Sequence, residues 1–307
     1  MNLQEQLDNY PDDVIDINFQ YKTLGYLPEL SRFKNLKILC CFDTKLQEIY
    51  NLPSRLEYLD CCYNQLKNLP ELPFTLTFLN CSVNILTTLP KLPIKLNKLV
   101  CFDNKLTKLP KLPESLTELK CSVNKLTNIP DLPNSLKILQ CNNNKLILLP
   151  EVILTSLIYI NCANNLLIKL PKLPQNLQTL DCSINYLREI PILPPKLRIL
   201  FCSYNNLTGI LPDLPYTIND NSMLEFYFNN LIYNMYTVKC VNITNQKIRN
   251  FKYTFYCLKF KSKFRNWLWD KVRRPKIESL CHPLRITGLL EKGIDIMDLD
   301  IHLEKNV

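Results

Sequence analysis

Leucines recur along most of the chain at fixed intervals, with polar residues and prolines between them. Within each interval, a Leu-x-Cys segment alternates between apolar and polar positions, as a strand does when one of its faces is buried. A Leu-Pro-x-Leu-Pro segment follows, in which two prolines fix the backbone angle φ and remove two backbone donors. The pattern therefore predicts a short strand followed by an extended or polyproline-like coil, repeated many times.

Cysteines mark the repeat most clearly, because nine of them fall in register: Cys41, Cys61, Cys81, Cys101, Cys121, Cys141, Cys162, Cys182 and Cys202. The step is 20 residues, with a single step of 21 after Cys141. Aligned on these residues, the unit reads LxxLxCxxNxLxxLPxLPxx, and a weaker unit with Ile17 and Phe19 precedes them. We predict roughly ten units over residues 14–215, a period typical of solenoids.

A single unit is too small to fold alone. Its roughly six buried side chains contribute about 2 kcal/mol each, whereas its 20 residues each lose about 1 kcal/mol or more of backbone entropy. Stacking adds what is missing, since strands of neighbouring units pair in parallel about 4.8 Å apart. We therefore predict a solenoid with a parallel β-sheet on its concave face, coil on its convex face and a continuous leucine interior.

Asparagines stand three residues after most of these cysteines: Asn64, Asn84, Asn104, Asn124, Asn144, Asn165, Asn185 and Asn205. An amide at a corner where the chain leaves a strand can bond to backbone groups of its own and the adjacent turn. We expect these residues to be structural rather than catalytic. Thr44 takes this place in the first complete unit, so we expect the row of asparagine hydrogen bonds to be weaker at that end.

The cysteines themselves allow two interpretations. Stacked thiols could bind metal, but parallel side chains do not converge tetrahedrally, and no Cys-x-x-Cys or Cys/His cluster accompanies them. Free cysteine is also a small, well-buried apolar residue, which is the interpretation we favour. We predict no metal and no cofactor. Strand alternation turns Cys40 and Cys62 outward, which makes them candidate exposed thiols.

This repeat resembles that of leucine-rich repeat proteins. Its short Leu-Pro-x-Leu-Pro form is similar to the repeat domains of bacterial secreted effectors and to repeat proteins of giant viruses that infect amoebae. The resemblance covers about two thirds of the chain. It departs from those families in having cysteine where leucine or valine is more common. The resemblance implies a protein-binding scaffold, with a host protein as the partner.

Catalysis has little support in the sequence. Some effectors of this kind carry a ubiquitin-ligase domain of several hundred residues with a Cys-x-Asp nucleophile, whereas only 92 residues follow the repeats here. Cys240, Cys257 and Cys281 lack an aspartate two positions later, and His282 and His302 are the only histidines. Four glycines are too few for a phosphate-binding loop. We predict no enzyme and no small-molecule substrate.

We divide the chain into an N-terminal segment (1–13), the solenoid (14–215) and a mostly helical C-terminal cap or tail (216–307). The first residues are acidic rather than basic and apolar, so we expect no signal peptide. The uncharged stretch 152–168 contains three asparagines and is too polar for a membrane span. We predict an intracellular protein, in the host cytoplasm if it is viral.

Alternation places a set of side chains on the concave face, which we name the aromatic–acidic patch: Phe42, Tyr58, Asp60, Tyr63, Phe78, Val100, Phe102 and Asp103. Exposed rings with acidic neighbours are typical of protein-binding hot spots. The alternative is that the rings pack on one another along the sheet or against a terminal cap.

Basic residues concentrate after the repeats. Residues 247–276 contain eleven lysines and arginines and one aspartate, a balance of 11 − 1 = +10 beside +9 for the whole chain. The basic tail that we single out consists of Lys259, Lys261, Lys263, Arg265, Lys271, Arg273 and Arg274. A basic amphipathic helix here predicts contact with anionic membrane, nucleic acid or a calmodulin-like partner. The other interpretation is a helix that caps the last repeat, with its basic residues solvated.

Overall fold

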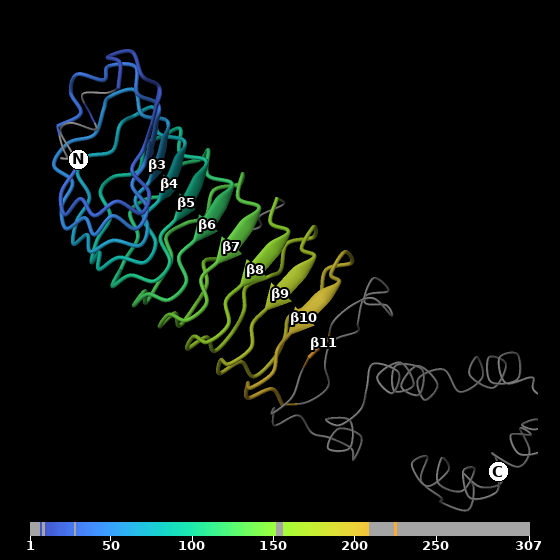
Figure 1. The fold of residues 1–307 in the computed structure, drawn as a ribbon. Helices are drawn as coiled ribbons and strands as arrows, with labels where there is room; N and C mark the ends of the chain where they lie inside the picture. The colour runs from blue at the N-terminus through green and yellow to red at the C-terminus, as the bar shows by residue number, and fades with distance from the viewer. Residues whose placement is uncertain (1–6, 8–9, 28, 152–155, 209–223, 226–307) are drawn as a thin grey trace, which may run out of the picture. The chain divides into compact units, whose positions relative to one another are not determined.

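The computed structural model describes residues 7, 10–27, 29–151, 156–208 and 224–225, and Figure 1 shows their path. Within them, eleven strands form one parallel sheet in which each strand lies beside its neighbours in sequence. The strands are β1 (Asp16–Asn18), β2 (Ile38–Cys40), β3 (Tyr58–Asp60), β4 (Phe78–Asn80), β5 (Lys98–Val100), β6 (Glu118–Lys120), β7 (Ile138–Gln140), β8 (Tyr159–Asn161), β9 (Thr179–Asp181), β10 (Ile199–Phe201) and β11 (Leu224–Glu225). This arrangement confirms the predicted solenoid with a parallel sheet.

The strands keep one register along the stack. The central leucines oppose each other, as Leu59 does Leu79, and are buried, whereas the residues on either side are partly exposed in most strands. The extra residue of the 21-residue unit lies between β7 and β8. Leu139 still pairs with Ile160, so the extra residue does not change the strand register. The weaker first unit also joins the stack, since Ile17 pairs with Leu39 and is fully buried.

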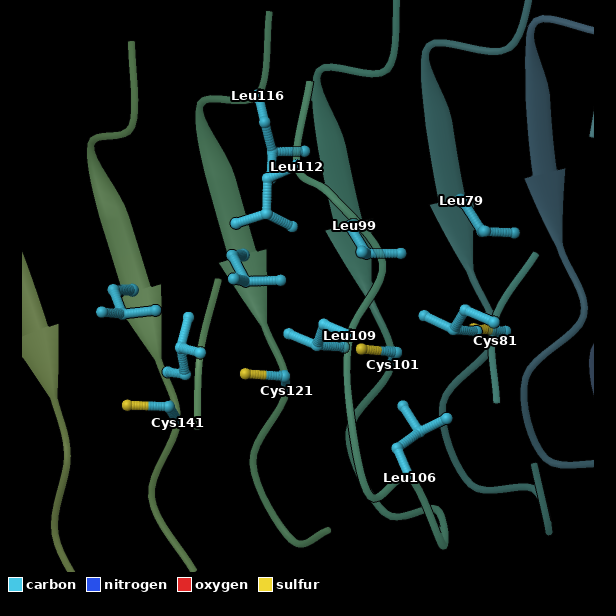
Figure 2. Close-up of a cluster of buried hydrophobic side chains, with 14 of the residues drawn as sticks. Leu79, Cys81, Leu99, Cys101, Leu106, Leu109, Leu112, Leu116, Cys121 and Cys141 are labelled. Atoms are coloured by element: carbon cyan, nitrogen blue, oxygen red, sulfur yellow. The ribbon is translucent and has the colours of Figure 1, made fainter. Parts of the chain in front are cut away.

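Leucines and cysteines from successive turns form one continuous apolar interior. All nine in-register cysteines, which we call the cysteine column, have no exposed surface. In Figure 2, the sulfurs of Cys81, Cys101, Cys121 and Cys141 lie one turn apart at the ends of successive strands. The cysteines are free thiols in the described part of the chain, and their burial confirms the prediction that they belong to the apolar interior. They fill the narrow corner of the interior between the strand and the following turn.

The asparagines make the backbone bonds that the sequence predicts. Asn104 donates from Nδ2 to the carbonyl oxygens of Cys81 (3.0 Å) and Cys101 (3.3 Å), and its Oδ1 accepts from the N–H of Leu86 (3.0 Å). One amide thus ties two adjacent turns together. Thr44 takes over part of this role at the first complete turn, where its hydroxyl donates to the carbonyl of Cys41 at 2.8 Å.

Prolines form the turn that leads from each coil segment into the next strand. In the described Leu-Pro-x-Leu-Pro segments, the carbonyl of the second proline accepts from the N–H three residues later, as Pro93 does from Leu96 at 3.1 Å. Proline lacks a donor but keeps this acceptor, so it suits the turn that leads into the next strand. A hydroxyl on the equivalent turn of the next unit adds a bond between units, since Ser115 donates to the carbonyl of Leu96 at 2.7 Å.

The residue before each asparagine adopts a left-handed backbone conformation. The angle φ is 54° at Tyr63, 53° at Asp103 and 53° at Val123. Such values are rare for residues other than glycine and costly for a β-branched side chain such as Val123. The asparagine amides hold this turn by capping the carbonyls around it, since Asn124 donates to the carbonyl of Ser122.

The chain divides into two compact units, residues 1–234 and 235–307. Strand β11 pairs with β10 and lies beyond residue 215, the predicted end of the repeats. The predicted C-terminal cap of residues 216–307, apart from β11, falls outside the described residues, as does most of the N-terminal segment 1–13.

Candidate binding surface

The exposed side of the sheet, together with the turn residues between each strand and the asparagine position that follows it, forms the sheet face. Outward side chains on either side of each central strand residue project there and are partly exposed in most strands. Parallel register places the same position of adjacent strands side by side, so Tyr58 lies beside Phe78, and Asp60 beside Asn80. All eight residues of the aromatic–acidic patch lie on this face, four on strands and four on the following turns.

Aromatic rings of the patch pack against each other across adjacent turns. Tyr58 and Phe78 stack with ring centroids 4.3 Å apart and planes 3° apart. Phe42 and Tyr63 meet edge to face at 5.1 Å. Sideways packing, the alternative that the sequence left open, therefore occurs in both pairs. The rings nevertheless keep solvent access, since Tyr63 remains 51% exposed.

Asp60 is held between two neighbouring turns. Its Oδ1 accepts from the N–H of Cys62 (3.1 Å) and its Oδ2 from the Nδ2 of Asn80 (3.2 Å). Partial burial, followed by the Asp60 charge, raises the pKa of the Cys40 thiol to about 11. The same two causes raise the pKa of Tyr58. At neutral pH the Cys40 thiol and the Tyr58 phenol beside Asp60 therefore keep their protons.

Val100, Phe102 and Asp103 lie on β5 and the turn after it, one to three turns from the ring pairs. Val100 and Phe102 are half-buried and Asp103 is exposed. Among the ring contacts found in the described residues, none involves Phe102. The structure therefore brings the predicted residues onto one face but not into one cluster.

Two features of this face are not among those predicted from the sequence. Tyr21 meets Phe42 edge to face at 5.1 Å and extends the ring group to the first turn. Glu118 lies 2.7 Å from the ammonium of Lys120 and 3.4 Å from that of Lys98. Burial raises the pKa of Glu118, but the two lysines outweigh it and the net shift is downward. Tyr21 stands at the same position of its repeat unit as Tyr63, and this equivalence could have placed it on the sheet face from the sequence.

The prediction that the Cys62 thiol is exposed is wrong. Alternation assigned it to the outside, yet it is 5% exposed. Cys62 takes the same position as Phe42 and Phe102 on their turns, but its side chain is small and lies against the side chains of Asp60 and Ser82. The N–H of Cys62 is bound by the Asp60 carboxylate, and burial is the main cause that raises the pKa of its thiol. Cys40, the other candidate, is half-buried.

The thiols of the cysteine column are expected to be unreactive. Burial raises the pKa of Cys81 and of Cys121 to about 12. A thiol that stays protonated is a poor nucleophile and a poor metal ligand. In the described part of the chain, no group of three or more His, Cys, Asp or Glu side chains is arranged to hold a metal ion.

Several predicted features fall outside the described residues: the basic tail, Cys281, His282 and His302. No helix within the described ranges has the length and apolar content needed to cross a membrane.

Comparison with solved structures identifies the fold. YopM from Yersinia enterocolitica is 34% identical with a TM-score of 0.69, and the alignment covers 73% of this chain and 48% of YopM. The functional domain of InlJ from Listeria monocytogenes, described as including a cysteine ladder, is 30% identical with a TM-score of 0.60 over 71% of this chain and 49% of InlJ. The Leptospira interrogans leucine-rich repeat protein LIC12759 is 28% identical with a TM-score of 0.54, over 75% and 70% of the two chains.

The chain spans about half the length of the YopM and InlJ chains that it matches. No protein-family model and no curated protein matches it. Leucine-rich repeat proteins are generally protein-binding scaffolds, whose stacked repeats present extended surfaces. The parallel sheet, the constant register and these similarities together show that the repeat region of the chain is a leucine-rich repeat solenoid.

Proposed function

We propose that the chain is a non-catalytic scaffold that holds a partner protein on its sheet face, the predicted concave face, through the aromatic–acidic patch. The observation that carries this proposal is the mutual packing of the rings. Tyr58 and Phe78 support each other at 4.3 Å, as Phe42 and Tyr63 do at 5.1 Å. Rings held in place before binding lose little freedom when a partner covers them, so more of their burial contributes to affinity.

Charge on this part of the face favours a partner with basic groups. Asp60 is half-buried and fixed by two hydrogen bonds, and the carboxylates of Asp43 and Asp103 are exposed on turns. An apolar segment with lysine or arginine beside it would pair with this arrangement. The resemblance to bacterial effector and giant-virus repeat proteins suggests a host protein as the partner, met inside the host cell.

Affinity capture with the full chain tests this proposal. Replacing Tyr58, Tyr63 and Phe102 with alanine should abolish capture of the partner and leave the fold intact. A matched variant with Gln140, Asn142 and Ser183 changed to alanine alters the polar half of the same face and should retain the partner. If the aromatic variant retains full binding while its circular dichroism is unchanged, the patch is not the recognition site.

The basic tail supports a second candidate function, since residues 247–276 carry a balance of +10. In this alternative, the tail tethers the protein to anionic membrane or nucleic acid and the repeats act as a spacer. Changing Lys261 and Arg265 to glutamate in the full chain should then weaken salt-sensitive binding to phosphatidylserine vesicles or to RNA. Absence of any such binding at low salt would refute the tether.

A further inference from the structure

A second surface lies on the turns that follow the strands, facing away from the interior beyond the asparagines. We call it the turn flank and define it by two parallel rows. The first row runs Lys105, Lys125, Lys145, Leu166 and Tyr186, and the second runs Thr107, Thr127, Ile147, Ile168 and Arg188. Each row takes one residue per turn, and every residue in it is exposed.

Backbone hydrogen bonds hold these rows in line. The N–H of Lys145 donates to the carbonyl of Leu126 at 2.9 Å, and the N–H of Leu166 donates to that of Leu146 at 2.9 Å. The same bond joins Tyr186 to Leu167 one turn further on. Each residue of the first row is therefore fixed beside the preceding turn, and the row advances by about 4.8 Å per turn, the spacing of parallel strands.

The chemistry of the flank changes abruptly along the stack. Its earlier turns carry lysine and threonine, whereas its later turns carry isoleucine, leucine and tyrosine, with Arg188 at the far end. Ile147 is 50% exposed and Ile168 54% exposed on adjacent turns, with Leu148 and Leu166 exposed beside them. Single exposed apolar residues are ordinary, but a contiguous group on neighbouring turns marks an interaction site.

Lysines border this apolar group without acidic partners. Among the described residues, the ion pairs found involve none of Lys105, Lys125 and Lys145. The backbones of these three lysines lie on successive turns about 4.8 Å apart, which concentrates positive charge, so a row of acidic groups on a partner would relieve the repulsion. Charge complementarity therefore favours a partner with acidic side chains opposite the earlier turns and apolar side chains opposite the later turns.

We propose that the turn flank binds an acidic amphipathic helix of a partner protein, laid along the solenoid axis. A helix rises about 5.4 Å per turn, so it meets a row spaced about 4.8 Å apart with nearly one side chain per turn. One end of its stripe carries glutamates or aspartates against the lysines, and the other end carries leucines against Leu166 and Ile168. Recognition of this kind places an apolar helix face on an exposed apolar surface.

An anionic bilayer fits this surface less well. Glu189 and Glu151 are exposed beside the apolar group, and the carboxylate of Glu151 lies 3.5 Å from the ammonium of Lys169. Carboxylates next to the apolar residues would face the lipid headgroups and be repelled. The site is separate from the sheet face and does not depend on the aromatic–acidic patch.

The test uses the full-length protein and a fluorescent 18-residue helical peptide with three glutamates and then leucines on one stripe. We expect it to bind at least ten times more tightly than a peptide of the same composition in scrambled order. Lys125→Glu should weaken binding at least tenfold, whereas Gln65→Glu, at the same position of an earlier turn, should change it less than twofold. Ile168→Ser should also weaken binding at least tenfold, and Ile94→Ser, at a still more exposed isoleucine of the coil, should not.

Equal affinity for the ordered and scrambled peptides would overturn the proposal, as would equal losses in the target and control variants. Lysine-dependent binding to phosphatidylserine vesicles without binding to the peptide would also overturn it, in favour of a membrane. The variant with Tyr58, Tyr63 and Phe102 changed to alanine should bind the peptide normally, which separates this site from the proposed function of the sheet face.

Discussion

The interior and the sheet face of the solenoid are made by the same strands, yet they vary in opposite ways along the stack. Inside, Leu59, Leu79 and Leu99 succeed each other with no change and no exposed surface. Outside, one residue earlier in the same strands, the side chain changes from Tyr58 to Phe78 and then to Lys98. The interior must fit the turns on both sides, whereas the outer positions meet solvent and remain free to differ.

This difference shows where stability and recognition reside in the molecule. Substitutions in the constant columns should change the free energy of unfolding. Substitutions on the sheet face should change binding while the fold persists.

The largest expected effect is the response of the cysteine column to alkaline pH. Burial raises the pKa of Cys121 to about 12, whereas an unfolded thiol loses its proton near pH 8.5. The thiol's contribution to stability is therefore fully present below about pH 8.5 and is lost as the pH rises toward 12. Each such thiol should lower the free energy of unfolding by about 1.4 kcal/mol per pH unit in this window. Urea titrations at successive pH values measure this slope.

Cys121→Ala provides the control for this prediction. Its free energy of unfolding should fall with pH less steeply than that of the unchanged protein. The two slopes should differ by about 1.4 kcal/mol per pH unit, which corresponds to one proton. Stability that stays constant from pH 8.5 to 11 would contradict the burial of the column.

Loss of an interior asparagine should have the next largest effect. Asn104→Ala removes the amide that bonds to the carbonyls of Cys81 and Cys101 and leaves the N–H of Leu86 without its acceptor. Unpaired buried groups cost roughly 1–3 kcal/mol each, so we expect a total loss of about 3 kcal/mol in chemical denaturation. Asn128→Ala, at an exposed position, should cost less than about 0.5 kcal/mol. Equal losses in the two variants would refute the structural role of the asparagines.

The smallest expected effect is a gain at the left-handed turn. Val123 has φ of 53°, a conformation that asparagine tolerates and a β-branched residue does not. Val123→Asn should therefore raise the free energy of unfolding by about 1 kcal/mol. Val123→Thr keeps the branched Cβ and should give no such gain in the same urea titration. An unchanged or lowered stability in Val123→Asn would show that the turn carries no strain at this position.

Most of the fold was predictable because it depends on periodicity. The leucine and cysteine positions indicated which side chains are buried, and the asparagine spacing indicated the bonds that Asn104 makes. The turn after the strand was not predictable in the same way. Strand alternation assigns Cys62 to the outside, as it does Phe42 and Phe102, but the small Cys62 side chain lies against Asp60 and Ser82 and is buried.

The candidate site was predictable in position but not in internal contacts. Alternation correctly placed Tyr58 and Phe78 on one face, and parallel register made them neighbours. Whether the two rings stack or lie apart depends on side-chain rotamers and on the offset between turns, which a residue pattern does not contain. The Glu118 cluster was missed for a related reason, since its lysines come from two different strands.

Site-specific photo-crosslinking tests the central claim most directly. Benzoylphenylalanine placed at Phe102 lies on the sheet face, and the same group placed at Phe74 lies on an exposed coil position between strands. With the captured partner bound to the full chain, position 102 should form a crosslink and position 74 should not. Crosslinks from position 74 alone, or equally from both positions, would contradict recognition by the sheet face.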